Sequence, residues 1–261
     1  MLKRIVLFNI FFILIPCIVY SSNLVITTLD NPPQAYLEKG TPSGVLVDIV
    51  SEIVKKSGCT CTIKVVPWKR ALKMVKIGTA DAIFNAGYTA ERNKYLFYPS
   101  CALITEKVIA LRRKGSGVFL KTDFSNAKDY RVGVGRGFYY GKKVQNAIDS
   151  NMFMRVEEVP NINLNMEKLK LSRIDMFFAD YLPAMNFLTS IDSKANIELV
   201  VDPTTGKPII YGRSDTYLAF SRTHTLDGLV KKINEELVNL KKSGSYDEII
   251  KKYIKGYIDL E

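Results

Sequence analysis

Two residues of opposite charge follow apolar runs, at points where a fold could present them to a ligand. Arg92 comes shortly after the apolar run 82–84, and Asp180 directly follows the run 176–179. The planar guanidinium of arginine matches a carboxylate bidentately, whereas a carboxylate beside an apolar strand needs a cation or donors because burying it unpaired is costly. Arg92 and Asp180 could therefore hold the two ends of a zwitterion. A salt bridge between them, or two unrelated surface charges, is the alternative.

Glycine, hydroxyl, amide and aromatic residues gather beside these charges. After the run 82–84 come Asn85, Gly87 and Thr89, and after the strand-like segment 130–135 come Gly137, Phe138 and Tyr139. Glycine lets the backbone approach a ligand, and the free N–H groups of a helix N-terminus can seat an anion. The glycines of the second segment do not satisfy G-x-G-x-x-G, so the sequence does not favour a nucleotide loop there.

Residues at other strand ends could enlarge the same pocket. Trp68 is the only tryptophan, and Arg70 follows two positions later at a predicted strand-to-helix junction. Trp68 is either a core residue or the wall of a cleft into which Arg70 reaches. Tyr36, which follows the first predicted strand together with Pro33 and Gln34, could supply another wall.

Nucleophilic and metal chemistry find little support in the sequence. His224 is the only histidine, so a serine or cysteine triad lacks its base and a metal site lacks ligands. No histidine or second carboxylate is evident beside Asp180 to act as a general acid or base. We therefore expect a protein that binds a small molecule without catalysis and without a cofactor or metal.

Strand and helix patterns alternate along the chain that must position these residues. In the segment 44–58, for example, Leu46, Ile49, Val50 and Ile53 recur at helical spacing. Strands separated by helices predict parallel sheets, and open α/β sheets bind ligands beyond the carboxyl ends of their strands. The order of the elements predicts two such sheets, with a crossing near residues 112–117, and two amphipathic helices at the end.

The first residues have the pattern of a cleaved export signal. Lys3 and Arg4 precede an apolar run over residues 5–15, and Ser21 suits the cut, which predicts a signal peptide over residues 1–21. The apolar run is short for a bilayer span. Pro16 stands before Cys17 where a lipoprotein needs a small residue. We therefore expect a protein of the periplasm.

Charge and cysteine content narrow the partners. The net charge is +11, falling to +9 once Lys3 and Arg4 leave with the signal peptide. The lysines come mostly in pairs with acidic residues nearby, which indicates a solvated surface rather than a nucleic-acid interface. We expect a monomer. Export would permit a disulfide among Cys59, Cys61 and Cys101, but their spacing does not say which would pair.

Five segments, taken in order, resemble the family-3 bacterial solute-binding proteins, the amino-acid receptors of ABC importers. They are GVLVDIVSEIVKKSG (44–58), ALKMVKIGTADAIFNAGYTAERNKYLFYP (71–99), YRVGVGRG (130–137), RIDMFFAD (173–180) and LKKSGSYDEIIKKY (240–253). The resemblance covers the chain from about Leu24 to Tyr257. It implies an α/β, two-lobed type II periplasmic binding fold, in which each lobe is a mainly parallel sheet flanked by helices and two hinge crossings join the lobes.

The resemblance also implies roles and boundaries. Lobe 1 would comprise residues 22–112 and 214–261, and lobe 2 residues 113–213. Arg92, in T-x-E-R, would clamp the α-carboxylate of an amino acid or related carboxylate, and Asp180 would take its α-ammonium. Hinge closure would bury the ligand and present a closed surface to an ABC permease in the inner membrane.

The sequence departs from the family pattern at two places. Gly87, Phe138 and Tyr139 stand where typical members carry hydroxyl residues. Two other functions on the same scaffold are the alternatives: a cyclohexadienyl dehydratase-like enzyme, and a periplasmic sensor acting through a membrane partner.

Overall fold

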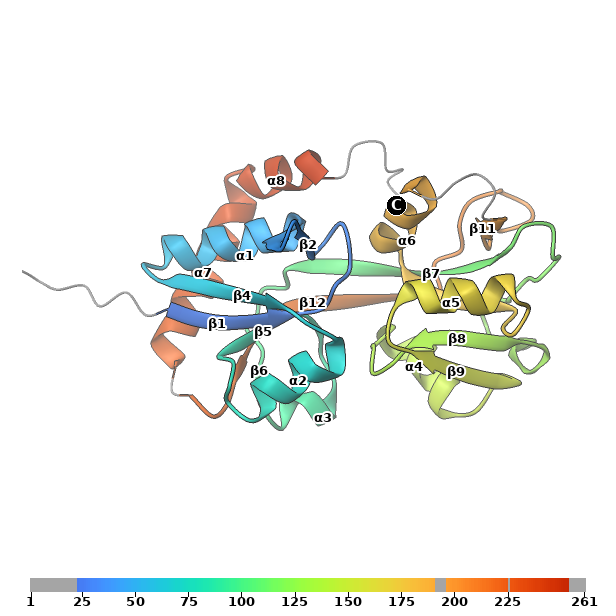
Figure 1. The fold of residues 1–261 in the computed structure, drawn as a ribbon, viewed down its shortest axis with the longest axis horizontal. Helices are drawn as coiled ribbons and strands as arrows, with labels where there is room; N and C mark the ends of the chain where they lie inside the picture. Colours follow the sequence, from blue (N-terminus) through green and yellow to red (C-terminus); the bar gives the residue numbers. More distant parts are fainter. Residues whose placement is uncertain (1–22, 191–195, 225, 254–261) are drawn as a thin grey trace, which may run out of the picture.

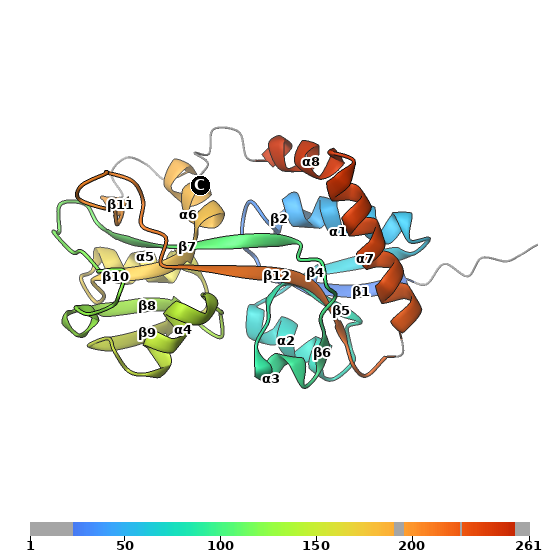
Figure 2. The same ribbon diagram turned by 180° about the vertical axis from the view of Figure 1, so that it is seen from behind.

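Two long strands run through the middle of the molecule and join two α/β lobes (Figures 1 and 2). They are β7 (Ile104–Arg113) and β12 (Gly212–Ser221), which pair antiparallel with each other. The computed structural model describes residues 23–190, 196–224 and 226–253, and the predicted signal peptide lies outside them. Along β7, Ile104 packs on the core of the first lobe and Val108 on that of the second, so the strand crosses between lobes over this short stretch.

The first lobe holds the N-terminal strands and the C-terminal helices. Its strands are β1 (Asn23–Thr28), β4 (Thr60–Val65), β5 (Ala82–Gly87) and β6 (Leu96–Phe97), with a hairpin of β2 (Tyr36–Glu38) and β3 (Thr41–Ser43). Its helices are α1 (Val45–Lys56), α2 (Trp68–Lys76), α3 (Ala90–Asn93), α7 (Asp227–Lys242) and α8 (Ser245–Tyr253). Helices α1, α7 and α8 contact one another on one face of the sheet, whereas α2 lies on the other (Figure 1).

The helical spacing in the sequence explains this packing. Leu46 and Ile53 of α1 are fully buried and share a core with Ile233 and Leu237 of α7. Strand alternation sends neighbouring residues of β5 to opposite faces: Phe84 joins this core, and Ile83 joins the one beneath α2.

The second lobe repeats the alternation of strands and helices. Its strands are β8 (Arg131–Gly135), β9 (Arg155–Val159), β10 (Met176–Asp180) and β11 (Ile197–Leu199), and its helices are α4 (Gly141–Asp149), α5 (Ile162–Lys170) and α6 (Tyr181–Ser190). A short 3-10 turn, η1 (Ala127–Asp129), precedes β8. Two cores flank its sheet, one containing Phe178 and Tyr211, the other containing Phe177 and Leu169.

Apart from the β2–β3 hairpin, the described strands form one continuous sheet through both lobes, in the order β4-β1-β5-β12-β7-β10-β8-β9, with β6 paired to β12 and β11 to β7. Pairing is parallel within each lobe (β4 with β1, β1 with β5, β10 with β8, and β8 with β9) and antiparallel wherever β7 or β12 takes part. The mainly parallel, two-lobed α/β prediction is confirmed. The two predicted sheets are joined, because the crossing strands hydrogen-bond to each other and to both lobes. The division of the chain at residues 112 and 214 stays a prediction.

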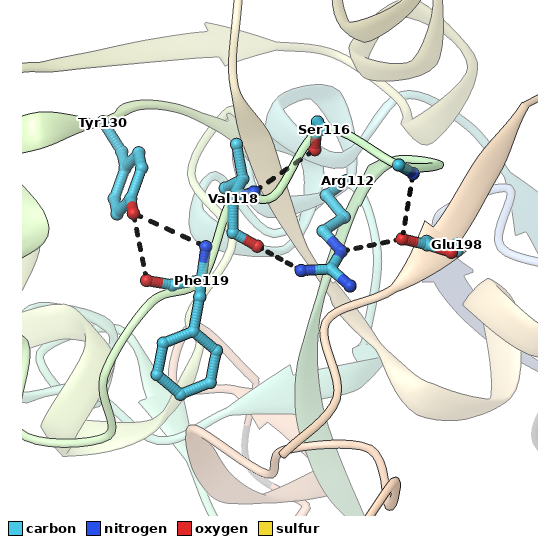
Figure 3. Close-up of polar contacts among 7 residues, drawn as sticks. Arg112, Ser116, Val118, Phe119, Tyr130 and Glu198 are labelled. Carbon is cyan, nitrogen blue, oxygen red and sulfur yellow. Dashed lines mark hydrogen bonds and ion pairs between the residues drawn. The ribbon is translucent and has the colours of Figure 1, made fainter. Parts of the chain in front are cut away.

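The segment 112–117, where the sequence predicted a crossing, lies at the end of β7 (Figure 3), beyond the stretch between Ile104 and Val108 over which the strand passes between the lobes. Arg112 donates from Nε to Glu198 of β11 at 2.9 Å and from Nη1 to the carbonyl of Val118 at 2.5 Å. The Tyr130 hydroxyl donates to the carbonyl of Phe119 at 3.1 Å. These contacts fix the glycine-containing turn onto the second lobe.

Several of the short elements were not predicted from the sequence. The β2–β3 hairpin, β6 and α3 have two to four residues each, too few to show a periodicity. Cys59, Cys61 and Cys101 are unpaired and pack against the core of the first lobe. No helix in the described part of the chain has the length and hydropathy that crossing a bilayer requires.

Candidate functional site

One cavity between the lobes, of about 360 Å³, is lined by Thr89, Arg92 and Tyr139 among others, and two other cavities between the lobes share Asp180. The larger of these two, of about 290 Å³, is bounded by the loop after β1, including Asp30, and by residues of β8, α5, β10 and α6. The smaller, of about 30 Å³, lies beside Arg92 and has room for about two water molecules. Asn31, Phe138 and Asp180 stand in the walls of both cavities.

Arg92 is buried, with 7% of its surface exposed, and its guanidinium bridges the lobes. Thr89 caps the short helix α3, and its hydroxyl accepts from the Arg92 N–H at 3.1 Å. Nη1 donates to the Gly87 carbonyl and Nη2 to the Gly137 carbonyl, both at 2.8 Å. The guanidinium carbon lies 5.4 Å from the ring centroid of Trp68. Desolvation lowers the pKa of Arg92, but the pKa of an arginine lies so far above neutral pH that the guanidinium stays charged.

The loop after β8 closes onto Arg92 from the second lobe. Trp68 Nε1 donates to the Gly137 carbonyl at 2.9 Å, and the Trp68 and Phe138 rings meet edge to face at 6.5 Å. Tyr139 lies against Gly87, where a Cβ would approach its Cδ1 to 2.9 Å. The two departures from the family pattern are therefore spatially linked: Tyr139 occupies the room that a side chain at position 87 would need.

A buried amide network lines the smaller cavity on the other side. Gln34 is fully buried, and its Oε1 accepts from Asn31 Nδ2 at 3.0 Å and Asn85 Nδ2 at 2.9 Å. These two donors leave Gln34 Nε2 to bond Glu106 Oε1, at 2.5 Å. Asn85 lies at a bulge in the β5–β12 pairing and has a φ of +61°. Asparagine tolerates this left-handed conformation, and such bulges re-aim side chains at functional sites.

Two carboxyls, Glu106 and Asp180, face this cavity from different elements. Glu106 lies on β7 with 3% of its surface exposed, and Asp180 ends β10. Burial raises the pKa of Glu106 well above its ordinary value, and the charge of Asp180 raises it further, outweighing the bond from Gln34. Burial raises the pKa of Asp180 to about 7. Two close carboxyls in a desolvated site retain a proton near neutral pH.

The structure brings most of the predicted site residues together. Trp68, Asn85, Gly87, Arg92, Phe138, Tyr139 and Asp180 line the smaller cavity, and Gly137 adjoins it through its carbonyl. Thr89 acts on the Arg92 backbone instead. Arg70 is exposed and Tyr36 half-buried, and neither lines either cavity. Arg92 donates to two carbonyls rather than to Asp180, so the simple salt bridge between them is not formed.

Sequence reasoning missed Glu106, whereas it named Gln34, the amide that holds Glu106, only as a possible part of a pocket wall. The statement that no second carboxylate stands beside Asp180 was wrong, because the antiparallel pairing of β7 with β10 brings Glu106 to the same site. One signal was available: Glu106 interrupts the strand pattern of ITEKVIALRR, and a carboxylate inside a buried strand is rare unless it is paired.

Comparison with known proteins agrees with the fold. The family model for bacterial extracellular solute-binding proteins, family 3, matches residues 24–256. The L-cystine-binding protein TcyA of Bacillus subtilis (strain 168) is 22% identical over 224 residues, which is 85% of this chain and 76% of TcyA.

Two solved structures share the architecture. A histidine kinase sensor domain with similarity to periplasmic binding proteins superposes with a TM-score of 0.76 at 16% identity, covering 90% of this chain and 97% of the domain. An ancestral arginine-binding protein bound to arginine superposes with a TM-score of 0.74 at 22% identity, covering 89% of this chain and 98% of that protein. Since the family model spans nearly all of the described fold, the chain belongs to the bacterial extracellular solute-binding proteins, family 3.

Proposed function

We propose that this protein is an exported receptor that captures an amino acid or a related small carboxylate between its lobes and delivers it to an ABC importer. The observation that carries the proposal is the position of the Asp180 carboxyl. This carboxyl faces both cavities at the junction of the lobes, and its pKa is set by burial, with no hydrogen-bond donor of the described chain acting on it. A desolvated carboxyl without a donor is costly, and a ligand ammonium would supply the missing donors and charge.

Arg92 is the proposed partner of the ligand's carboxylate. In the structure, its Nη2 donates to the Gly137 carbonyl, and the adjoining cavity of about 30 Å³ is smaller than a carboxylate-bearing ligand needs. The carboxylate would therefore take the place of the Gly137 carbonyl. A guanidinium–carboxylate pair, in which both partners are charged and two parallel bonds can form, is stronger than a single bond from the guanidinium to a neutral carbonyl. Ligand and loop would therefore compete for the same guanidinium.

The larger cavity would receive the rest of the ligand. Its walls combine the amides of Asn161, Asn163 and Asn186 with the rings of Phe178 and Phe187. Such a lining suits a side chain with both polar and apolar parts. Closure of the lobes would then follow as a population shift toward the form that makes contacts from both sides.

A thermal-shift screen of the exported protein, freed of co-purified solutes, tests this function. The panel contains amino acids including arginine and cystine, the corresponding decarboxylated amines, polyamines and organic acids. A solute at one hundred times its dissociation constant adds about 2.7 kcal/mol of stability. We expect one amino acid to stabilise the protein, with the shift lost in both Arg92→Ala and Asp180→Asn. Stabilisation by organic acids alone, or an amino-acid shift that survives both substitutions, would contradict the proposal.

The paired carboxyls favour one second candidate, an enzyme of the cyclohexadienyl dehydratase type. Glu106 and Asp180 together supply the proton-bearing carboxyl that such chemistry needs and that the sequence did not reveal. Incubation with a prephenate-like cyclic acid, followed by ultraviolet detection of an aromatic product, separates the two. Product formation that disappears in Glu106→Gln would support the enzyme, and an unchanged substrate would support the receptor.

A further inference from the structure

Glu106 has no part in the receptor function proposed above, although it is among the most deeply buried charged residues described. In the antiparallel ladder Asp180 pairs with Val108, which stands two positions after Glu106 on β7. Residues two apart on a strand share a face, as do directly opposed residues. Glu106 and Asp180 therefore project from the same face of the sheet, and both line the smaller cavity.

Two buried polar atoms near this pair have no hydrogen-bond partner among the described residues. Asn85 Oδ1 is buried and has no partner among the described residues. Ser214, opposite Glu106 in the β7–β12 ladder, is 6% exposed and its Oγ likewise has no partner within the described chain. Gln34 donates to one oxygen of Glu106. Unpaired buried polar groups are rare in native proteins. The Ser214 hydroxyl can donate or accept, but Asn85 Oδ1 can only accept, so it indicates a donor on the ligand.

The distribution of charge around the smaller cavity also favours a cationic ligand group. Arg92 is the one cation among the residues lining the smaller cavity, whereas Glu106 and Asp180 are two potential anions. The guanidinium of Arg92 is turned to the carbonyls of Gly87 and Gly137. The carboxyl pair therefore lacks a counter-ion from the described chain.

We propose that Glu106 and Asp180 form one seat for the ammonium group of the ligand, and that Glu106 restricts this group to a primary ammonium. The inference rests on the receptor function above and adds a specificity-determining residue to it. Three N–H donors can bond both carboxyls and Asn85 Oδ1 at once. A methylated nitrogen would set a methyl group against one of these acceptors and leave it unpaired, and sites built to hydrogen-bond a polar group reject analogues that lack it.

A proton would leave as the ammonium enters. Five other titratable groups of the described chain lie about the pair: Arg92 and Tyr139 beside the smaller cavity, Asp30 across the larger cavity, Tyr140 near Asp180 and Tyr246 near Glu106. Of these, Arg92 alone brings positive charge, so the free pair keeps a shared proton near neutral pH. Since this proton and the ammonium compete, affinity should fall about tenfold for each pH unit below about 7.

Methylammonium is the probe for this seat, because it presents a primary ammonium and needs no knowledge of the natural ligand. It is titrated into exported protein with carbon-13-labelled carboxyl groups, at constant ionic strength, with tetramethylammonium in parallel. Glu106→Gln and Asp180→Asn assign the two resonances, and Glu106→Asp tests rescue by a retained charge. Glu158→Gln, at a 56% exposed side chain on β9, is the matched control.

We expect methylammonium to move both resonances saturably at pH 8, at least tenfold more weakly in Glu106→Gln and unchanged in Glu158→Gln, while tetramethylammonium moves neither. A response of Asp180 alone, no response, or equal binding of tetramethylammonium would overturn the inference. The outcome is separable from the receptor proposal. If an amino acid binds but Glu106→Gln has no effect, only this inference fails; if methylammonium occupies both carboxyls but no amino acid binds, only the receptor proposal fails.

Discussion

Replacing the proposed ammonium-binding residue should make the ligand-free protein more stable. Asp180 is an acid whose pKa rises from 3.8 to about 7 on folding, so the folded state disfavours its charged form. Between these pH values the folded protein binds more protons than the unfolded chain, and the free energy of unfolding therefore falls as pH rises. This loss of unfolding free energy is absent below about pH 4 and complete above about pH 7. Asp180→Asn removes the charge and hence the loss.

The size of the effect follows from the same pKa values. Each pKa unit is worth about 1.36 kcal/mol, so a rise from 3.8 to about 7 corresponds to about 4 kcal/mol at most. Asp180 faces two cavities that admit water, and Glu106 can carry the shared proton, so we expect a gain of about 1 to 3 kcal/mol. For a chain of this size that is a rise in Tm of about 2 to 12 °C.

Differential scanning calorimetry of Asp180→Asn and wild type, at pH 8 and pH 4 without ligand, measures this gain. We expect a higher Tm for the variant at pH 8 and nearly equal values at pH 4. Asp175→Asn is the control of opposite sign. At Asp175 the hydrogen bonds and charge of Arg131 outweigh desolvation and lower the pKa, so its loss should destabilise at pH 8. A lower Tm for Asp180→Asn at pH 8, or an equal gain at both pH values, would refute the reasoning.

Three other perturbations test the closure of the lobes and the packing of the core. Gly87→Ala should weaken ligand binding, since its Cβ would lie 2.9 Å from Tyr139 Cδ1; Tyr139→Ala in the same chain should restore it, and a failure to restore would exclude this clash as the cause. Arg92→Lys should lower the free energy of unfolding by about 1 kcal/mol, the contribution of one inter-lobe hydrogen bond, and lower the Tm with it. A single ammonium cannot match the guanidinium fork that bonds both the Gly87 and the Gly137 carbonyl. An unchanged Tm would mean that these bonds contribute nothing to stability. Leu46→Ala, at a fully buried position of α1, should cost about 2 to 5 kcal/mol in urea unfolding, whereas a cost below 1 kcal/mol would show that α1 does not anchor the core.

Most of the fold could be predicted because its signals are local. The apolar spacing of α1 and the alternation of strands and helices reflect burial along a few turns of chain. Elements of two to four residues, such as β6 and α3, were not predicted because their formation depends on neighbours distant in sequence. Strand β6, for example, forms by pairing with β12. The same dependence joined the two predicted sheets into one through β7 and β12.

The candidate site divides in a similar way. Arg92 and Asp180 could be singled out from the sequence because each follows an apolar strand at its carboxyl end, where open sheets bind ligands. The hydrogen bonds from Arg92 to the carbonyls of Gly87 and Gly137 could not be predicted, because Gly137 lies 45 positions away and belongs to the other lobe. The contact of Tyr139 with Gly87 depends on the same packing of the two lobes.

The sequence by itself thus determined which residue types stand at strand ends and which helices and strands carry them. Tertiary structure alone decided that Gln34, Glu106 and Asp180 meet, since they come from a loop of the first lobe, the crossing strand and the second lobe. The physical reason is that strand register and lobe closure are set by long-range pairing and by burial of the whole core, whereas periodicity and capping are read within a few residues.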